Sequence, residues 1–143
     1  MKRIAAVLMG LAVVLLGFGA SQAQLDLAKA LVGKWEGEME YLYTRSGDPK
    51  RVLVIESVKQ TDGRWIAEGQ FGTAQQMGRV RIDVESSGNS VSLKWVTRSG
   101  SDYFLNLMQE KYLVGKATIP MDQGRSVRQS SREDRAMKLE KVK

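Results

Sequence analysis

Hydrophobic and polar residues alternate with a period of two along most of the chain after residue 34. From Trp35 to Tyr43 the odd positions are aromatic, apolar or glycine, and positions 36, 38 and 40 are glutamate. A β-strand points successive side chains to opposite faces of its sheet. This segment is therefore predicted to be a half-buried antiparallel strand.

Short turn signals divide the rest of the chain into similar segments. The clearest is Thr61-Asp62-Gly63, because Asp-Gly favours the tight turn of a hairpin. A helical period occurs before the strands, at Leu25 to Val32, and residues 120–134 are polar and are predicted to be irregular. Further strands are expected at 51–59, 65–71, 79–85, 91–95, 102–109, 112–119 and 136–142.

About eight short strands joined mostly by hairpin turns predict an all-β fold with a short N-terminal helix. Such a meander must hide its edge strands, and closure into an up-and-down antiparallel barrel does so. A two-sheet sandwich is the alternative, but sandwiches favour long crossing connections, and the chain has one long gap. The interior of an eight-stranded barrel holds its own side chains or one small ligand.

The second predicted strand, 51–59, is apolar on both faces, so its orientation is open. If Val54 points into the barrel, Glu56 does too, and its buried carboxylate would need a partner. If Leu53 and Ile55 point inward, Glu56 is an ordinary surface charge. We favour the surface position for Glu56.

The first 23 residues differ from the rest of the chain. Lys2 and Arg3 precede an uncharged apolar stretch over residues 4–20, and Ser21-Gln22-Ala23 supplies the small residues that signal peptidase recognises. Residues 1–23 are therefore predicted to be a cleaved signal peptide, which leaves a periplasmic or secreted domain, 24–143. An uncleaved anchor is the alternative, because an apolar run of about 17 residues is at the lower limit for a spanning helix.

The chain contains neither cysteine nor histidine. Disulfides, cysteine nucleophiles, Ser-His-Asp triads and metal sites built from thiolates or imidazoles are therefore excluded. General acid–base chemistry would depend on carboxylates, lysine or tyrosine. We expect a protein that is not an enzyme and that needs no cofactor and no metal.

Basic residues concentrate near the C-terminus. The formal net charge is +6, and removal of Lys2 and Arg3 would leave +4. Four arginines at spacings of three, four and three would share one face of a helix: Arg125, Arg128, Arg132 and Arg135. A solvated loop is the ordinary explanation of this pattern. The alternative is an anion-binding stripe for acidic lipid headgroups or polyanions of the envelope. Nucleic acid is not expected for an exported protein, nor is a membrane span after cleavage.

One motif adds a resemblance. Leu31-Val32-Gly33-Lys34-Trp35 and the closing segment 137–141 resemble bacterial extracytoplasmic lipocalin-like (calycin) barrels, in which a short helix, Gly-x-Trp and a strand follow one another. The resemblance implies that Gly33 and Trp35 close one end of the barrel. It also implies that a basic side chain, Lys141 or Arg135, lies across the tryptophan ring.

By the same resemblance, the other end admits a small apolar or amphipathic molecule. Tyr41 and Tyr43 are the favoured contacts because they lie far along the first strand from Trp35 and combine an apolar ring with a polar tip. The ordinary role of the other aromatic residues is to fill the core. The candidate ligand residues are Tyr41, Tyr43, Trp65, Phe71 and Trp95.

Three functions follow from these patterns. The first is an exported binding protein with a modest apolar cavity that opens near Tyr41 and Tyr43, with room left by the small residues Gly37, Ala67 and Gly69. The second is a non-enzymatic envelope interaction or structural protein with a filled barrel and a basic C-terminal surface. The third, least favoured, is an enzyme that uses carboxylates or tyrosine inside the barrel.

Overall fold

A computed structural model describes residues 22–40, 49–120 and 132–143. This part of the chain forms one helix followed by eight strands, so the predicted all-β fold with a short N-terminal helix is confirmed. The signal peptide expected at residues 1–23 lies almost wholly outside the described residues. The elements are α2 (Gln22–Leu31), β1 (Gly33–Met39), β2 (Lys50–Thr61), β3 (Arg64–Gly72), β4 (Met77–Ser87), β5 (Ser90–Val96), β6 (Asp102–Met108), β7 (Tyr112–Pro120) and β8 (Arg132–Lys141).

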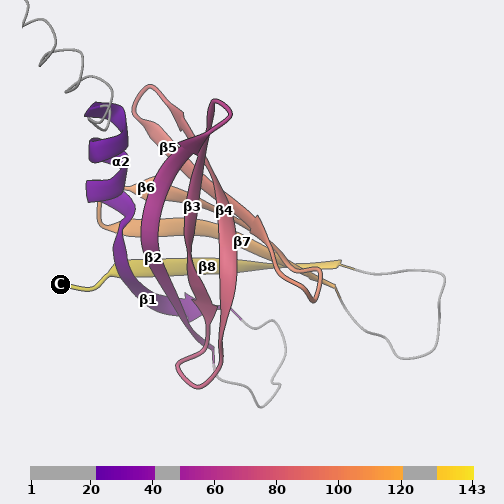
Figure 1. Ribbon diagram of the computed structural model, residues 1–143. Coiled ribbons are helices and arrows are strands. Elements are labelled where there is room, and N and C mark those ends of the chain that lie inside the picture. Colours follow the sequence, from indigo (N-terminus) through magenta and orange to yellow (C-terminus); the bar gives the residue numbers. More distant parts are fainter. Residues whose placement is uncertain (1–21, 41–48, 121–131) are drawn as a thin grey trace, which may run out of the picture.

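The strands close into an up-and-down barrel. Each pairs antiparallel with the next along the chain, and β8 pairs antiparallel with β1 (Figure 1). The closing register places Trp35 opposite Lys141 and Met39 opposite Met137. Closure leaves no exposed sheet edge, which is the physical reason for preferring a barrel to the alternative sandwich.

The backbone of the β2–β3 hairpin adopts the tight turn that the sequence predicted. Asp62 and Gly63 both have positive φ, 52° and 76°, as the tight hairpin turn requires. The β6–β7 turn is different, because Gln109 and Glu110 each adopt φ 55° without a glycine. The polar character of this turn therefore predicted its place but not its conformation.

Both predicted boundaries of the irregular segment 120–134 are wrong. Pro120 is the last residue of β7, and it pairs with Arg132, the first residue of β8. Pairing with β7 thus makes β8 begin four residues before the predicted start at Ala136. In the first strand, the predicted continuation to Tyr43 lies outside the described residues.

A β-bulge explains why the orientation of β2 was open. The register with β3 shifts between Ile55 and Ser57, so Glu56 is an extra residue on β2. Ile55 points inward before the bulge and Val58 points inward after it. Inward apolar side chains therefore occupy odd positions before the bulge and even positions after it. Glu56 is exposed and forms a 2.9 Å ion pair with Arg79, so its expected surface position is confirmed.

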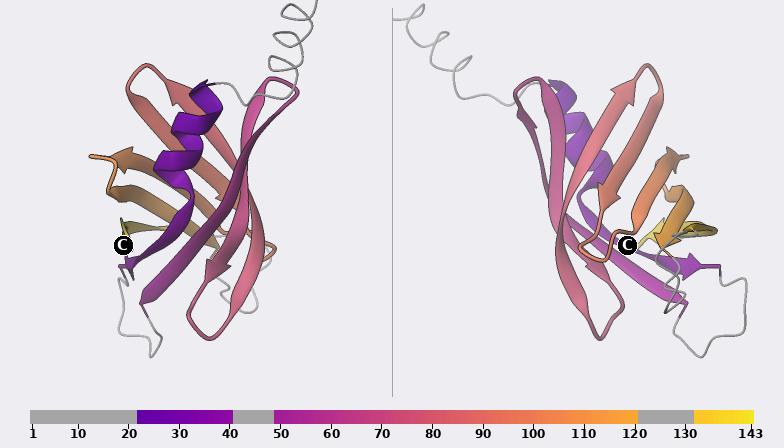
Figure 2. Two further views of the ribbon diagram at one scale, coloured as in Figure 1. Left: turned by 60° about the vertical axis from the view of Figure 1, so that its left-hand side comes forward. Right: turned by 90° about the vertical axis from the view of Figure 1, so that its right-hand side faces the viewer.

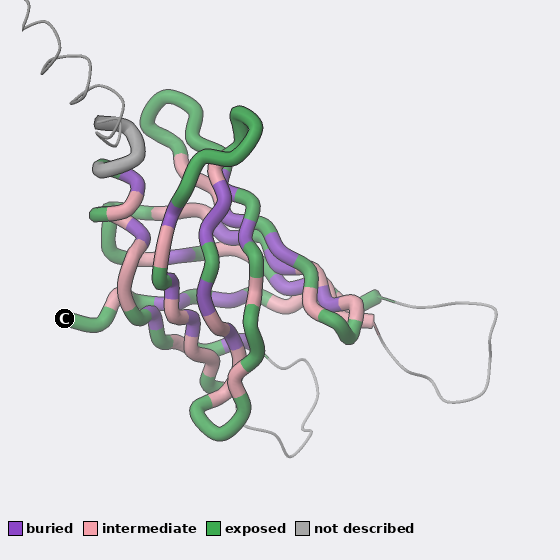
Figure 3. Tube along the Cα trace, viewed as in Figure 1, coloured by how far each residue is buried: buried purple, intermediate pink, exposed green. Residues whose placement is uncertain are grey.

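One apolar cluster lines the described interior, and α2 covers one end of it. Leu27 and Leu31 of α2 belong to the same buried cluster as the inward side chains of the strands. Figure 3 shows buried positions on α2 and along the strands. We call the end beneath α2 the closed end. The opposite end, where β1 ends and β8 begins, is the far end, and Figure 2 shows that α2 does not extend to it.

Glycines in the strands allow close contact between neighbouring backbones. A Cβ atom at Gly37 would lie 1.8 Å from the Lys138 carbonyl oxygen, and one at Gly69 would lie 1.8 Å from the Val54 carbonyl oxygen. Both positions thus need glycine because of the adjacent strand. The expectation that these two glycines leave room in the interior is wrong, because the missing side chain points at a neighbouring strand.

Candidate functional site

The closed end is held together by polar contacts between α2 and the barrel. Trp35 is fully buried, and its Nε1 donates a 2.9 Å hydrogen bond to the Leu31 carbonyl oxygen. Lys141 Nζ donates to the carbonyl oxygens of Lys29 and Ala30 at 3.0 and 3.1 Å. These carbonyls belong to the last turn of α2, which has no further helical partners for them.

The basic residue over the Trp35 ring is Lys141. Its Nζ lies 5.5 Å from the ring centroid, within the range of a cation–π contact. A Cβ atom at Gly33, where φ is 141°, would lie 3.2 Å from Lys141 Cε, so glycine leaves space for the lysine chain. Arg135, the other candidate for this position, lies closer to the start of β8, opposite Ala117.

Three aromatic rings meet inside the barrel, toward the far end. Phe71, Trp95 and Tyr103, here called the aromatic trio, are all buried. Trp95 and Tyr103 stack with an interplanar angle of 8° and a centroid distance of 4.9 Å. Phe71 meets these rings edge-on at 5.3 and 4.7 Å. Interlocking of this kind fixes the planes of all three rings.

Two of the predicted ligand residues, Phe71 and Trp95, are thus brought together. Tyr103 completes the trio, although the sequence predicted for it only the core-filling role that is ordinary for an aromatic residue. Trp65 is half-buried at the start of β3, near the closed end, and is not part of the trio. Tyr41 and Tyr43 lie outside the described residues. Phe104 faces outward and is 40% exposed, so a core position is wrong for it.

A charged pair points into the barrel at the far end. Glu133 and Arg135 occupy the inward phase of β8 that Met137 and Leu139 continue. Their side chains are 11% and 12% exposed, and Arg135 Nη2 donates a 3.0 Å hydrogen bond to Glu133 Oε2. Sequence inspection missed this pair because Glu133 lay in a segment predicted to be irregular.

Register connects the charged pair to the aromatic trio. Trp95 pairs with Tyr103, Tyr103 with Ala117, and Ala117 with Arg135, so these residues are consecutive partners across β5 to β8. Inward side chains of neighbouring strands share the narrow interior of an eight-stranded barrel. The small side chain of Ala117 therefore separates Tyr103 from Arg135 along this row.

Among the buried polar atoms of this region, Trp95 Nε1, a donor, and Glu133 Oε1, an acceptor, have no hydrogen-bond partner in the described part of the chain. Trp95 as a whole is 2% exposed. A buried polar atom left without a partner costs about 1–3 kcal/mol, and most buried polar groups in proteins are satisfied. These two atoms are therefore the clearest candidate contacts for a ligand.

The four-arginine stripe does not form one helical face. Arg132 and Arg135 lie on β8, where a spacing of three places them on opposite faces of the sheet. Arg132 is on the outer surface and bonds to Asp102 at 2.6 Å and to the Gly100 carbonyl oxygen at 3.2 Å. Arg125 and Arg128 lie outside the described residues.

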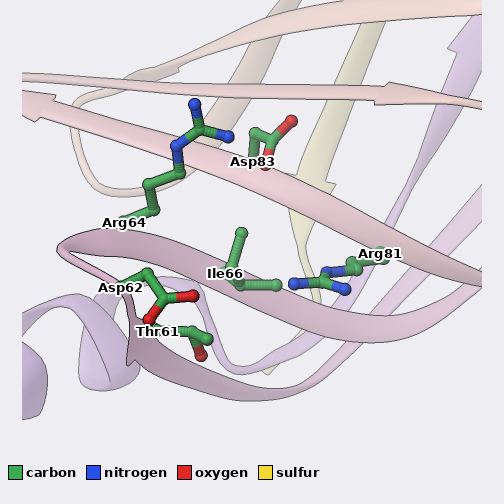
Figure 4. A pocket seen from close by; sticks show the side chains of 6 residues that line it. All are labelled: Thr61, Asp62, Arg64, Ile66, Arg81 and Asp83. Atoms are coloured by element: carbon green, nitrogen blue, oxygen red, sulfur yellow. The ribbon is translucent and has the colours of Figure 1, made fainter.

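A polar pocket of about 410 Å³ lies on the outer wall of the barrel, near the β2–β3 turn (Figure 4). Apart from Ile66, the residues that line it are exposed, so a molecule bound there would remain largely hydrated. The pocket contains none of the predicted ligand residues. It is lined by Thr61, Asp62, Arg64, Ile66, Arg81 and Asp83.

Comparison with known proteins adds no relative, so the fold is the main evidence about function. No family model matches the chain, and no curated protein is similar to it. The closed antiparallel barrel of eight strands is consistent with a lipocalin-like protein and is not specific to that family. Across residues 22–40, 49–120 and 132–143, no cluster of three acidic side chains could hold a metal ion, and no helix is long and apolar enough to cross a membrane.

Proposed function

We propose that the protein is a lipocalin-like binding domain that acts outside the cytoplasm. It holds one small amphipathic molecule in the barrel interior, beside the aromatic trio and the Glu133–Arg135 pair. The observation that carries this proposal is the presence of two buried, unpartnered polar atoms, Trp95 Nε1 and Glu133 Oε1, in the described interior.

The stability of the fold does not explain why the Glu133–Arg135 pair and the Trp95 N–H are buried. Replacement of a buried ion pair by apolar side chains of similar size is often neutral or stabilising. An unpartnered buried donor or acceptor adds a further cost. A barrel shaped only for a solid core would therefore favour leucine or phenylalanine at positions 95, 133 and 135. Retained polar groups in a largely apolar interior are typical of a ligand site, where a few polar groups fix orientation.

The ligand reaches this site from the far end. α2 covers the closed end, and Trp35, Leu31 and Lys141 join the helix to the barrel there. The charged pair lies on the other side, in the first residues of β8. A ligand would therefore place its polar group near Glu133 and the Trp95 N–H, and its apolar part against the rings of the aromatic trio.

We propose binding without catalysis. Glu133 is the single carboxylate on the inward phase of the described strands, and Arg135 holds one of its oxygens. General acid–base catalysis at this site would need a second group to accept or donate a proton near the same ligand atom. No second carboxylate of the described interior meets that need.

Titration of delipidated protein with ten- and twelve-carbon amphiphiles tests the proposal. Saturable one-to-one binding by calorimetry, with a change in tryptophan fluorescence, is expected. Ala117→Leu should weaken binding because it fills the interior between Tyr103 and Arg135. Val114→Leu is the matched control, since it adds volume on the outer face of the same strand. Absence of binding to every probe by folded protein would overturn the proposal.

One observation favours a second candidate, attachment to an acidic envelope component. Phe104 is 40% exposed on the outer face, and its cross-strand partners on the two sides are Lys94 and Lys116. An exposed ring between two cations suits an anionic, partly apolar surface. Co-sedimentation with anionic but not zwitterionic vesicles would support this function, and reversal of both charges in K94E/K116E should abolish it.

A further inference from the structure

The charged pair determines which kind of head group fits beside it. An ionised carboxylate only accepts hydrogen bonds. Glu133 Oε2 accepts from Arg135, whereas Glu133 Oε1 has no hydrogen-bond partner in the described part of the chain. Glu133 and Arg135 together carry no net charge. A ligand group next to Oε1 must therefore donate a hydrogen bond, whereas an anion placed there would be repelled by the adjacent carboxylate in a region of low dielectric constant.

Trp95 imposes the opposite requirement on a second ligand atom. An indole Nε1 only donates hydrogen bonds. Stacking on Tyr103 and the edge contact with Phe71 fix the plane of the Trp95 ring, so the direction of its N–H bond is fixed as well. A ligand atom that meets this N–H must be an acceptor, such as a carbonyl or hydroxyl oxygen.

We propose that the interior site selects a neutral amphiphile whose polar end both donates and accepts hydrogen bonds, such as an amide or a hydroxylated ester, over a carboxylate with the same tail. This inference rests on the proposed function, because it specifies the ligand of the same site. It gives a different expectation from a fatty-acid carrier, in which a free cation would meet the carboxylate.

Three ten-carbon probes separate the alternatives at neutral pH: decanamide, decanoate and decyltrimethylammonium. Decanamide offers a donor and an acceptor, decanoate offers only acceptors and a negative charge, and the ammonium probe offers a positive charge without a hydrogen-bond donor. Satisfaction of one buried polar atom corresponds to about a tenfold gain in affinity. Calorimetry should therefore rank decanamide about tenfold tighter than either of the other probes.

Two substitutions assign this preference to individual atoms. Glu133→Gln supplies a side-chain donor and releases Arg135 from its anion, so the ratio of decanamide to decanoate affinity should fall to about one. Trp95→Phe removes the indole donor and should weaken decanamide and decanoate alike, without effect on decyltrimethylammonium. Glu68→Gln, on the exposed face of β3, is the matched control and should leave all three affinities unchanged.

The outcomes separate this inference from the function on which it rests. Failure of all three probes to bind folded protein contradicts the proposed function itself. Equal affinities for decanamide and decanoate, or tighter binding of decanoate, overturn the inference while interior binding stands. Near-ultraviolet circular dichroism confirms the fold of each variant. If Glu133→Gln does not fold, a lower decanamide preference after Trp95→Phe, measured relative to decyltrimethylammonium, still tests the requirement for an acceptor.

Discussion

Trp35 and Trp95 lie in two regions of the barrel that differ in how the indole N–H group is bonded. Both are inward and buried, at 0% and 2% exposure. Trp35 donates its indole N–H to Leu31 and lies beneath Lys141, whereas the N–H of Trp95 has no partner in the described part of the chain. The closed end therefore satisfies its own polar groups through α2. The interior near the trio leaves polar groups for another molecule.

The largest effect should come from truncation at the closed end. Trp35→Ala removes a fully buried ring together with its hydrogen bond to α2. Loss of a buried tryptophan side chain costs about 3–5 kcal/mol of unfolding free energy. Chemical denaturation at several urea concentrations measures this loss. An unchanged denaturation midpoint would contradict the structural role assigned to Trp35.

A matched pair of conservative substitutions sharpens the comparison. Trp35→Phe leaves the buried Leu31 carbonyl without its partner, which should cost about 1–3 kcal/mol beyond the loss of packing. Trp95→Phe removes a donor that has no described partner, so only the packing loss applies. Trp35→Phe should therefore lower the unfolding free energy more than Trp95→Phe does. Equal losses would mean that the two indole N–H groups are equally satisfied.

A smaller effect is expected at the lysine that joins β8 to α2. Lys141→Met removes two hydrogen bonds to helix carbonyls and the contact with Trp35, and should cost about 1–2 kcal/mol. Lys138→Met is the control, because Lys138 lies 4.4 Å from the Tyr112 ring on the outer face, away from α2. The thermal unfolding midpoints of the two variants are compared. Equal decreases in the midpoint would show that the contacts of Lys141 with α2 stabilise the fold no more than a surface cation–π pair does.

The smallest effects should appear at opposite extremes of pH. A hydrogen bond to Glu140, reinforced by Tyr112, raises the pKa of Lys111 above its ordinary 10.5. Its stabilisation is complete below pH 10.5 and is lost as pH rises through the folded-state pKa. A hydrogen bond from Thr118, followed by the charge of Lys116, lowers the pKa of Asp134 below its ordinary 3.8. Its stabilisation is complete above pH 3.8 and is lost as pH falls.

Thermal midpoints across the pH range test both signs. The difference between wild type and Lys111→Met should vanish at high pH, and that between wild type and Asp134→Asn should vanish at low pH. Because both groups lie on the outer surface, salt should reduce each difference. Loss of the Asp134 effect on the alkaline side would contradict its assignment.

The sequence predicted the barrel because its signals were local. Alternation marked the strands, Asp62-Gly63 marked a hairpin, and Gly33-x-Trp35 marked the join between helix and strand. The bulge at Glu56 could not be located, since a shift in register depends on the partner strand. Its effect was nevertheless visible as a run that is apolar on both faces.

The candidate site was only partly predictable for the same reason. Phe71 and Trp95 were identified as aromatic residues on inward phases, but their contact with Tyr103 joins three strands that periodicity cannot order in space. Glu133 was assigned to the polar segment 120–134, and Arg135 was assigned to a stripe of four arginines whose ordinary explanation is a solvated loop. Their inward direction follows from the pairing of β8 with β7, which composition does not indicate.

The resonances of the three tryptophan indole N–H groups offer the most direct test of the central claim. Single Trp→Phe variants assign the three peaks in a proton–nitrogen correlation spectrum, and decanamide is then added to saturation. The Trp95 N–H should move downfield as it gains an acceptor, while the Trp35 N–H, already bonded to Leu31, should stay in place. Movement of Trp35 with Trp95 unchanged, or no movement of either peak at saturation, would contradict the account.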